Sequence, residues 1–154
     1  MRIAKVITSL LIIQIFALPS FCEEVKRSAK IIYCKGKVEV RPAGKDFVPA
    51  KKGMILNEGD IIKTNLKSSA TLNLNGKGET ATVEIKEGSQ LMLAELIQDK
   101  EKQTQNTLLD LAIGKVLIKA KELHDENSKF EVKTPTSVVG VRGTTFAVEV
   151  EALK

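Results

Sequence analysis

The residue types that most often catalyse reactions or bind metal ions are scarce in this sequence of 154 residues. It contains one histidine, His124, and two cysteines, Cys22 and Cys34. A zinc site or a histidine-based triad needs several such side chains at defined spacings. His124 stands in a polar run with Asp125 and Glu126, which we interpret as a solvated surface loop and not as a cation site. We therefore predict no catalytic residue, no metal and no cofactor.

Two further features could bind a substrate, and neither has the spacing that its chemistry requires. The serines lack the Gly-x-Ser-x-Gly setting of a hydrolase nucleophile. The segment Gly76-Lys77-Gly78 resembles a phosphate-binding loop, but the longer glycine-rich spacing and the helix that would follow it are missing. We interpret this segment as a hairpin turn. The sequence thus favours a binding or structural module over an enzyme.

Composition narrows the partners that such a module can have. Apolar residues make up 43% of the chain and charged residues 28%, which is enough apolar surface for one folded domain. Aromatic residues make up only 4%, which is too few for a platform that stacks on bases. The net charge is +5, but the basic residues are scattered and form no cluster that would neutralise several phosphates. We expect no nucleic-acid partner.

The first 22 residues have the layout of a secretory signal peptide. Arg2 and Lys5 precede an apolar run that ends at Pro19. This run is shorter than the roughly 20 apolar residues that a membrane-spanning helix needs. We therefore expect residues 1–22 to be a cleaved signal peptide and residues 23–154 to form one exported domain of the periplasm or cell envelope. Without the leader, 22 Lys and Arg stand against 19 Asp and Glu, so the charges are nearly balanced.

The leader leaves two alternatives open. Lipid attachment at Cys22 would make the protein a lipoprotein, and an uncleaved leader would anchor it; only in these two cases do we expect a membrane attachment. Removal of Cys22 with the leader would leave Cys34 as a lone thiol in an oxidising compartment. We interpret Cys34 as a small buried hydrophobe, with an intermolecular disulfide as the alternative.

From Ile31 onward, apolar residues recur at every second position, which is typical of strands with one buried face. The clearest run is Thr144, Phe146, Val148 and Val150, whose intervening residues can stay in water. Turn residues separate the runs and predict about nine or ten short strands in one all-β domain. We expect antiparallel pairing, because parallel strands are buried on both faces and lose their polar alternation.

Two segments are less regular. The nine residues 98–106 include no apolar side chain, so we predict a long exposed loop there. The region of residues 89–102 could hold a short helix in place of a strand, because Leu91, Leu93 and Leu96 fit neither period.

Gly59 and Asp60 are residue types that favour a turn. Gly59 can take a positive φ without steric cost, and the Asp60 carboxylate can accept backbone N–H groups that hold the turn.

A second group of motif residues lies near the end of the chain. Pro135 follows Thr134 and belongs at a strand end or edge, because proline has no N–H to donate. Gly140 and Gly143 bracket Arg142, and glycine in a strand pattern indicates a bulge or a close approach of two backbones.

These motifs resemble the FecR-like domain family, which shows a Gly-Asp turn, an Ile-x-Thr strand and a late Thr-Pro followed by Val-Arg-Gly-Thr-x-Phe. The matching residues, within a core of about residues 36–150, are Gly59, Asp60, Thr64, Thr134, Pro135, Arg142, Gly143, Thr144 and Phe146. The resemblance implies an antiparallel β-sandwich with a jelly-roll-like architecture in the cell envelope. Named members signal from an outer-membrane receptor to a cytoplasmic sigma factor. Only five residues precede the apolar run here, so only the exported domain carries over.

Arg142 is a long cation between two glycines, and two interpretations stay open. In the structural one, its guanidinium binds turn carbonyls or a carboxylate such as that of Asp60. Arg142→Ala would then lower the melting temperature by several degrees. In the functional one, Arg142 recognises an anionic group on a partner, such as a peptidoglycan or lipopolysaccharide moiety.

Together these observations predict a non-enzymatic exported domain that binds an unidentified protein or glycan of the cell envelope and assists envelope signalling. One alternative is a structural lipoprotein or scaffold whose sheet edge pairs with a partner strand. The other is an enzyme that acts on envelope polysaccharide.

Overall fold

The computed structural model describes residues 24–74, 81–120, 127–143 and 145–151, and within these ranges every regular element is a strand. The strands in chain order are β1 (Glu24–Lys26), β2 (Ala29–Lys35), β3 (Val38–Arg41), β4 (Val48–Pro49), β5 (Ile55–Leu56), β6 (Ile61–Thr64), β7 (Ser69–Leu74), β8 (Ala81–Ile85), β9 (Gln90–Asp99), β10 (Thr104–Ala120), β11 (Lys129–Lys133), β12 (Val138–Val141) and β13 (Thr145–Val150). The described part of the chain holds no helix of the length and apolarity that crossing a bilayer requires.

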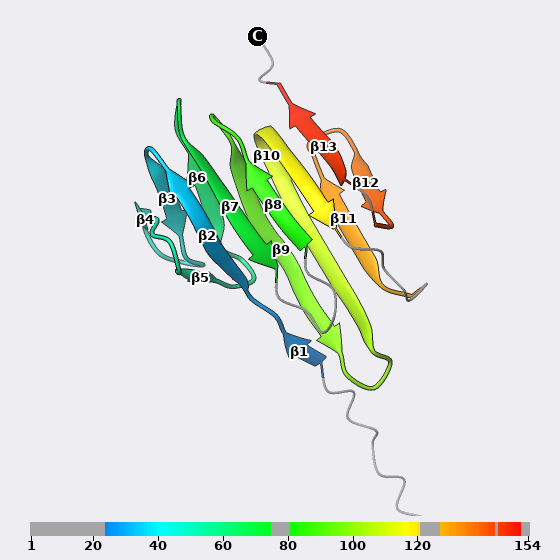
Figure 1. Cartoon of the computed structure of the whole chain (residues 1–154). Helices are drawn as coiled ribbons and strands as arrows, with labels where there is room; N and C mark the ends of the chain where they lie inside the picture. The colour runs from blue at the N-terminus through cyan, green and yellow to red at the C-terminus, as the bar shows by residue number, and fades with distance from the viewer. Residues whose placement is uncertain (1–23, 75–80, 121–126, 144, 152–154) are drawn as a thin grey trace, which may run out of the picture.

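The strands form one curled sheet of two layers, and β10 belongs to both layers (Figure 1). The first half of β10 pairs with β9 and β11, and its second half pairs with β8 and β13. The strand order is β4-β3-β6-β9-β10-β8-β7-β2-β5, with β1 on β9 and β12 on β11. The prediction of an all-β, antiparallel, sandwich-like domain is confirmed.

One pair departs from the antiparallel rule. Strand β11 runs parallel to the first half of β10, from Asn106 opposite Lys129 to Asp110 opposite Lys133. After these residues β10 continues into the second layer. The edge of its first half that faces away from β9 is therefore open, and β11, a strand from later in the chain, pairs there.

At two of the places where the chain passes between the layers, a glycine lies against a serine. Gly114, with φ +97°, divides β10, and Gly36, with φ +74°, separates β2 from β3. A Cβ atom on Gly36 would lie 2.5 Å from the Ser68 Oγ, and one on Gly114 would overlap Ser89. The N–H of the following lysine donates to the serine Oγ at 2.9 Å in both crossings. Strands that change layers need such a bend, and only glycine fits here.

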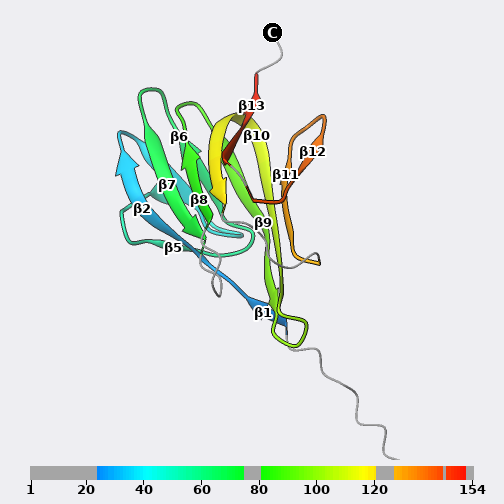
Figure 2. The ribbon, with the colours of Figure 1, turned by 45° about the vertical axis from the view of Figure 1, so that its right-hand side comes forward.

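The core lies between the two layers (Figure 2). Strand β7 shows how it forms, since Ala70, Leu72 and Leu74 are buried and the residues between them are only partly covered. The largest fully buried side chains are Ile31, Leu56, Ile62, Leu72, Leu74, Ile85, Leu91, Leu93, Leu96, Leu109, Leu111 and Ile118.

Within the irregular region of residues 89–102, Gln90–Asp99 form β9 and no helix is present. One extra residue, Ala94, stands in β9 where the register shifts, so that Leu108 faces Glu95 and Leu109 faces Leu93. A β-bulge of this kind moves the buried positions by one residue. It explains why Leu91, Leu93 and Leu96 are all buried although their spacing fits no single period.

The prediction of a long exposed loop at residues 98–106 is wrong. Strand β9 continues to Asp99 and β10 begins at Thr104, so only residues 100–103 form the turn. The side chains of Gln105 and Thr107 are buried and accept hydrogen bonds from the Arg27 guanidinium. Polar side chains can be buried in a strand when they are hydrogen-bonded. The polar composition of this segment therefore did not indicate a loop.

Two turn predictions have different outcomes. The expected hairpin turn at residues 76–78 lies outside the described residues. Gly140, for which we expected a bulge or close approach, pairs regularly with Glu131, and a Cβ there would meet no atom within 4 Å. That expectation is wrong, because β12 pairs only with β11 and nothing described covers Gly140.

Candidate functional site

The candidate site is a cleft of about 350 Å³ at the open end of the β11–β12 hairpin. Arg142 directly follows β12, and Gly143 after it has φ +78°, which glycine adopts without strain. The lining residues are Ser128, Lys129, Phe130, Glu131, Gly140, Val141 and Arg142.

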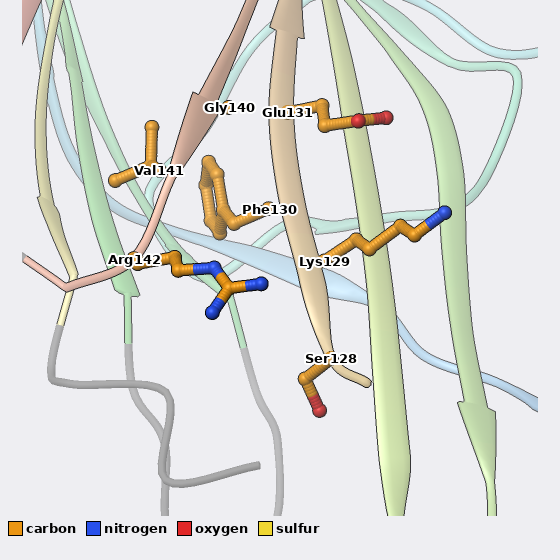
Figure 3. A pocket seen from close by; sticks show the side chains of 7 residues that line it. All are labelled: Ser128, Lys129, Phe130, Glu131, Gly140, Val141 and Arg142. Atoms are coloured by element: carbon orange, nitrogen blue, oxygen red, sulfur yellow. The ribbon is translucent and has the colours of Figure 1, made fainter. Parts of the chain in front are cut away.

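The hairpin holds the cleft in place through its buried pair. Phe130 on β11 faces Val141 on β12, and both side chains are buried. Their strand neighbours therefore point away from the core. Figure 3 shows the Arg142 guanidinium reaching from the end of β12 toward β11, between Phe130 and Ser128. The side chains of Lys129 and Glu131 extend from the other side of β11 in this view (Figure 3).

Two cations line the cleft, Lys129 and Arg142, and the guanidinium of Arg142 reaches across it toward β11 (Figure 3). The Arg142 side chain is exposed, and it makes no hydrogen bond or ion pair with any described residue. An uncommitted guanidinium keeps its planar fork of N–H donors available for a carboxylate or phosphate.

Asp60 lies in a different part of the fold and is not the partner of Arg142. Its side chain is 6% exposed. The Oδ1 atom accepts the N–H of Ala43 at 3.0 Å, and Oδ2 accepts the N–H of Asn57 at 2.8 Å. Gly59 has φ +88° in the same turn. The Asp60 carboxylate thus binds backbone and holds the turn before β6.

Thr64 and Thr134 also bond to backbone. The Thr64 hydroxyl donates to the carbonyl of Lys86 at 2.6 Å and accepts the N–H of Ser89 at 3.0 Å, which ties β6 to the β8–β9 turn. The Thr134 hydroxyl oxygen accepts the N–H of Ser137 at 3.0 Å. These two threonines hold turns, and neither lines the cleft that contains Arg142.

The remaining motif residues lie near the last strands. Pro135 is exposed in the turn that Thr134 closes, between β11 and β12. Phe146 is half-buried on β13 and packs against the core. Thr144 lies outside the residues that the structure describes, as do Cys22 and His124.

Two titratable groups have shifted pKa values. Burial raises the pKa of the Cys34 thiol, which is half-buried against the core, so the thiol is held in its protonated form. Hydrogen bonds from Lys86, and then from Lys119, lower the pKa of the Glu84 carboxyl. Among the described residues, no three His, Cys, Asp or Glu side chains gather in a way that could hold a metal ion.

The fold defines an all-β domain with an arginine-lined cleft at a hairpin end, and a comparison with protein families assigns the domain. The family described as FecR protein matches residues 60–153, more than half of the chain, and the chain belongs to that family. FecR is a family of cell-envelope signalling and regulation, so this is a domain related to envelope signalling. The match spans Asp60, Thr64, Thr134 and Arg142. No curated protein and no solved structure matches the chain.

Proposed function

We propose that this protein is an exported, non-enzymatic binding module of the cell envelope that captures an anionic group of a protein or glycan through Arg142. The single observation that carries the proposal is the uncommitted Arg142 guanidinium in the β11–β12 cleft. A structural arginine would be expected to be paired, and the carboxylate suggested by the motif, that of Asp60, is bound to backbone.

The chemistry of the cleft suits a carboxylate or a phosphate group. An exposed arginine does little for stability, whereas a bound anion can form two parallel N–H···O bonds with it. The buried Phe130–Val141 pair holds the backbone beside the cleft, so binding an anion has to order the exposed Arg142 side chain but not the strands.

The cellular location is part of the proposal. We infer that residues 1–22 are a signal peptide and that residues 23–154 act in the periplasm or cell envelope. The envelope association of the FecR family supports this location. Lipid attachment at Cys22 would place the same domain on a membrane.

A structural scaffold is the second candidate, and the edge of β12 favours it. This strand reads Val138-Val139-Gly140-Val141, pairs only with β11, and carries no charge or proline. Val138 is 59% exposed. Sheet edges usually carry lysine, proline or a bulge that blocks pairing, so an unprotected edge can accept a strand from a partner.

Photocrosslinking in intact cells tests the proposed binding. A photoreactive amino acid at Gly140, which lines the cleft, should give an adduct that Arg142→Ala abolishes. Lys52→Ala is the matched control, because that exposed lysine lies outside the residues that line the cleft and the adduct should persist. A photoreactive residue at exposed Lys45 should not give the same adduct. An adduct at Gly140 that survives Arg142→Ala would contradict the role of Arg142.

A further inference from the structure

A second surface, unrelated to the Arg142 cleft, gathers positive charge at one end of the molecule. Four lysines from different strands and turns line a hollow of about 840 Å³: Lys35, Lys67, Lys86 and Lys115. The other lining residues are Ser68, Ser69, Glu87 and Glu149. We call this hollow the lysine end.

The layer crossings at Gly36 and Gly114 bring these lysines together. Lys35 directly precedes Gly36, Lys67 directly precedes Ser68, and Lys115 directly follows Gly114. The crossings are held by serine–backbone bonds, so the backbone that carries the lysines is rigid. The connections β2–β3, β6–β7 and β8–β9 lie at the same end of the molecule, away from β1 (Figures 1 and 2).

The positive charge of the lysine end is only partly neutralised. Lys115 pairs with Glu149 at 2.8 Å, and Lys86 pairs with Glu84 at 3.0 Å. The Glu87 carboxylate accepts the backbone N–H of Lys67 at 2.6 Å. The ammonium groups of Lys35 and Lys67 have no ion pair with any residue that the structure describes.

An exposed leucine stands in the same turn as Lys67. Leu66 is 81% exposed, more than any other large apolar side chain in the described ranges. The Ser68 hydroxyl donates to its carbonyl at 3.0 Å, so the turn itself is ordered. A leucine held in water beside lysines is typical of a surface that enters the interface of a membrane, where the apolar side chain is buried and the cations meet headgroups.

We propose that the lysine end docks on a lipid bilayer that carries anionic headgroups. Lys35 and Lys67 bind headgroup phosphates, and Leu66 enters the boundary between headgroups and acyl chains. This docking needs neither the leader nor a lipid on Cys22, and it is independent of the anion site at Arg142. It would orient the domain with β1 away from the bilayer (Figure 1).

Vesicle cosedimentation tests the proposal on protein recovered from the exported fraction, with its mass showing that residues 1–22 and any lipid are absent. We expect binding to vesicles of phosphatidylethanolamine with about 30% phosphatidylglycerol and little binding to pure phosphatidylcholine. We also expect release near 1 M salt, because the Debye length there is only about 3 Å and the attraction between lysines and headgroups is screened. Equal binding to both vesicle types would overturn the proposal, as would the absence of binding to either.

Variants separate the contribution of the lysine charges from that of the Leu66 side chain. Lys35→Gln with Lys67→Gln should weaken partitioning about 25-fold, roughly fivefold for each lysine. Lys51→Gln with Lys52→Gln makes the same charge change elsewhere on the surface and should leave binding within about twofold. Leu66→Ser should weaken binding about tenfold. The melting temperature of each variant reports whether the domain still folds.

A soluble ligand is the alternative that these experiments distinguish. If Leu66→Ser binds vesicles as tightly as the parent protein, and millimolar inorganic phosphate displaces it, the lysine end recognises phosphate alone and the bilayer proposal fails. Neither result bears on Arg142, whose test uses crosslinking at Gly140.

Discussion

Gly114 lies against Ser89 so closely that no side chain fits between them. The N–H of Lys115 donates to the Ser89 hydroxyl at 2.9 Å, and this bond fixes the bend at which β10 leaves one layer for the other. Gly36 and Ser68 repeat the arrangement between β2 and β3. These two contacts therefore fix two of the bends by which the chain passes from one layer to the other.

Gly114→Ala should destabilise the domain by about 3 kcal/mol or more. The positive φ alone costs about 1–2 kcal/mol for a residue with a Cβ, and overlap with Ser89 adds to it. Thermal unfolding should show a loss of at least about 10 °C. Gly140→Ala is the matched control and should change the melting temperature by less than about 3 °C, because its φ is not positive and no atom lies near. Similar losses in both variants would mean that the contact with Ser89 is not the cause.

The two turns that precede the crossing serines should respond in opposite ways to substitution. Lys67 has φ +55° immediately before Ser68, and Gly88 has φ +64° immediately before Ser89. Gly88→Ala should lower the free energy of unfolding by about 1 kcal/mol, because a Cβ is strained at this φ although space is open. Lys67→Gly should raise it by up to about 1 kcal/mol. Denaturant unfolding measures both, and a loss of stability in Lys67→Gly would contradict the strain explanation.

Asp60→Ala should cost about 2–4 kcal/mol. The substitution leaves the N–H groups of Ala43 and Asn57 without their acceptor, and each unsatisfied buried donor costs about 1–3 kcal/mol. Asp60→Asn keeps the shape and one acceptor oxygen, so it should lose about half as much. Denaturant midpoints at constant slope give the comparison. An Asp60→Ala variant as stable as the parent would show that water replaces the carboxylate without cost.

Arg142→Ala should leave the melting temperature within about 2 °C of the parent protein, since the side chain is exposed and bonds to no described residue. The pairing interpretation of the sequence expects a fall of several degrees. Arg27→Ala provides the contrast, because the Arg27 guanidinium donates to Gln105 and Thr107, whose side chains are buried. Loss of that cation should cost about 2–4 kcal/mol. Differential scanning calorimetry of both variants decides between the two interpretations of Arg142.

Glu84 contributes a small stabilisation that depends on pH. Lys86 and Lys119 hold its pKa below the ordinary value of 4.5, so the folded state favours the ionised carboxyl. The contribution is present above pH 4.5 and disappears as the pH falls through the lowered pKa of the folded state. Because the bonds that Lys86 and Lys119 donate to Glu84 are exposed to solvent, Glu84→Gln should cost no more than about 1 kcal/mol at pH 7. The stabilities of variant and parent should converge in acid, and a difference that grows toward low pH would contradict this.

The buried face of most strands could be predicted from sequence because it depends on local alternation. In β7, residues from Ala70 to Leu74 alternate without interruption, and their burial follows that pattern. The pattern fails where a residue is inserted. Ala94 shifts β9 by one position, and a two-residue period cannot represent that shift. The three-residue spacing of Leu93 and Leu96 breaks the two-residue period of a strand, and this break is the sequence signal of the bulge.

The polar residues near the β9–β10 turn show a different limit. Gln105 lies in the segment predicted as a loop. Its side chain and that of Thr107 are buried because Arg27, which lies 78 and 80 positions earlier, bonds to both. The partner of a polar side chain is a matter of three-dimensional proximity. The same limit applies to Arg142, for which the motif suggested a carboxylate that the fold places elsewhere.

The sequence alone determined the class of fold, the turn at Gly59 and Asp60, and the family resemblance, because alternation, turn chemistry and motifs are local properties of the chain. Only the tertiary structure decided that Gly114 and Gly36 bend strands between layers, that Arg142 faces an open cleft, and that four separated lysines share one end. Those outcomes depend on contacts between residues far apart in the chain, which pack together only when the two layers close over a common core.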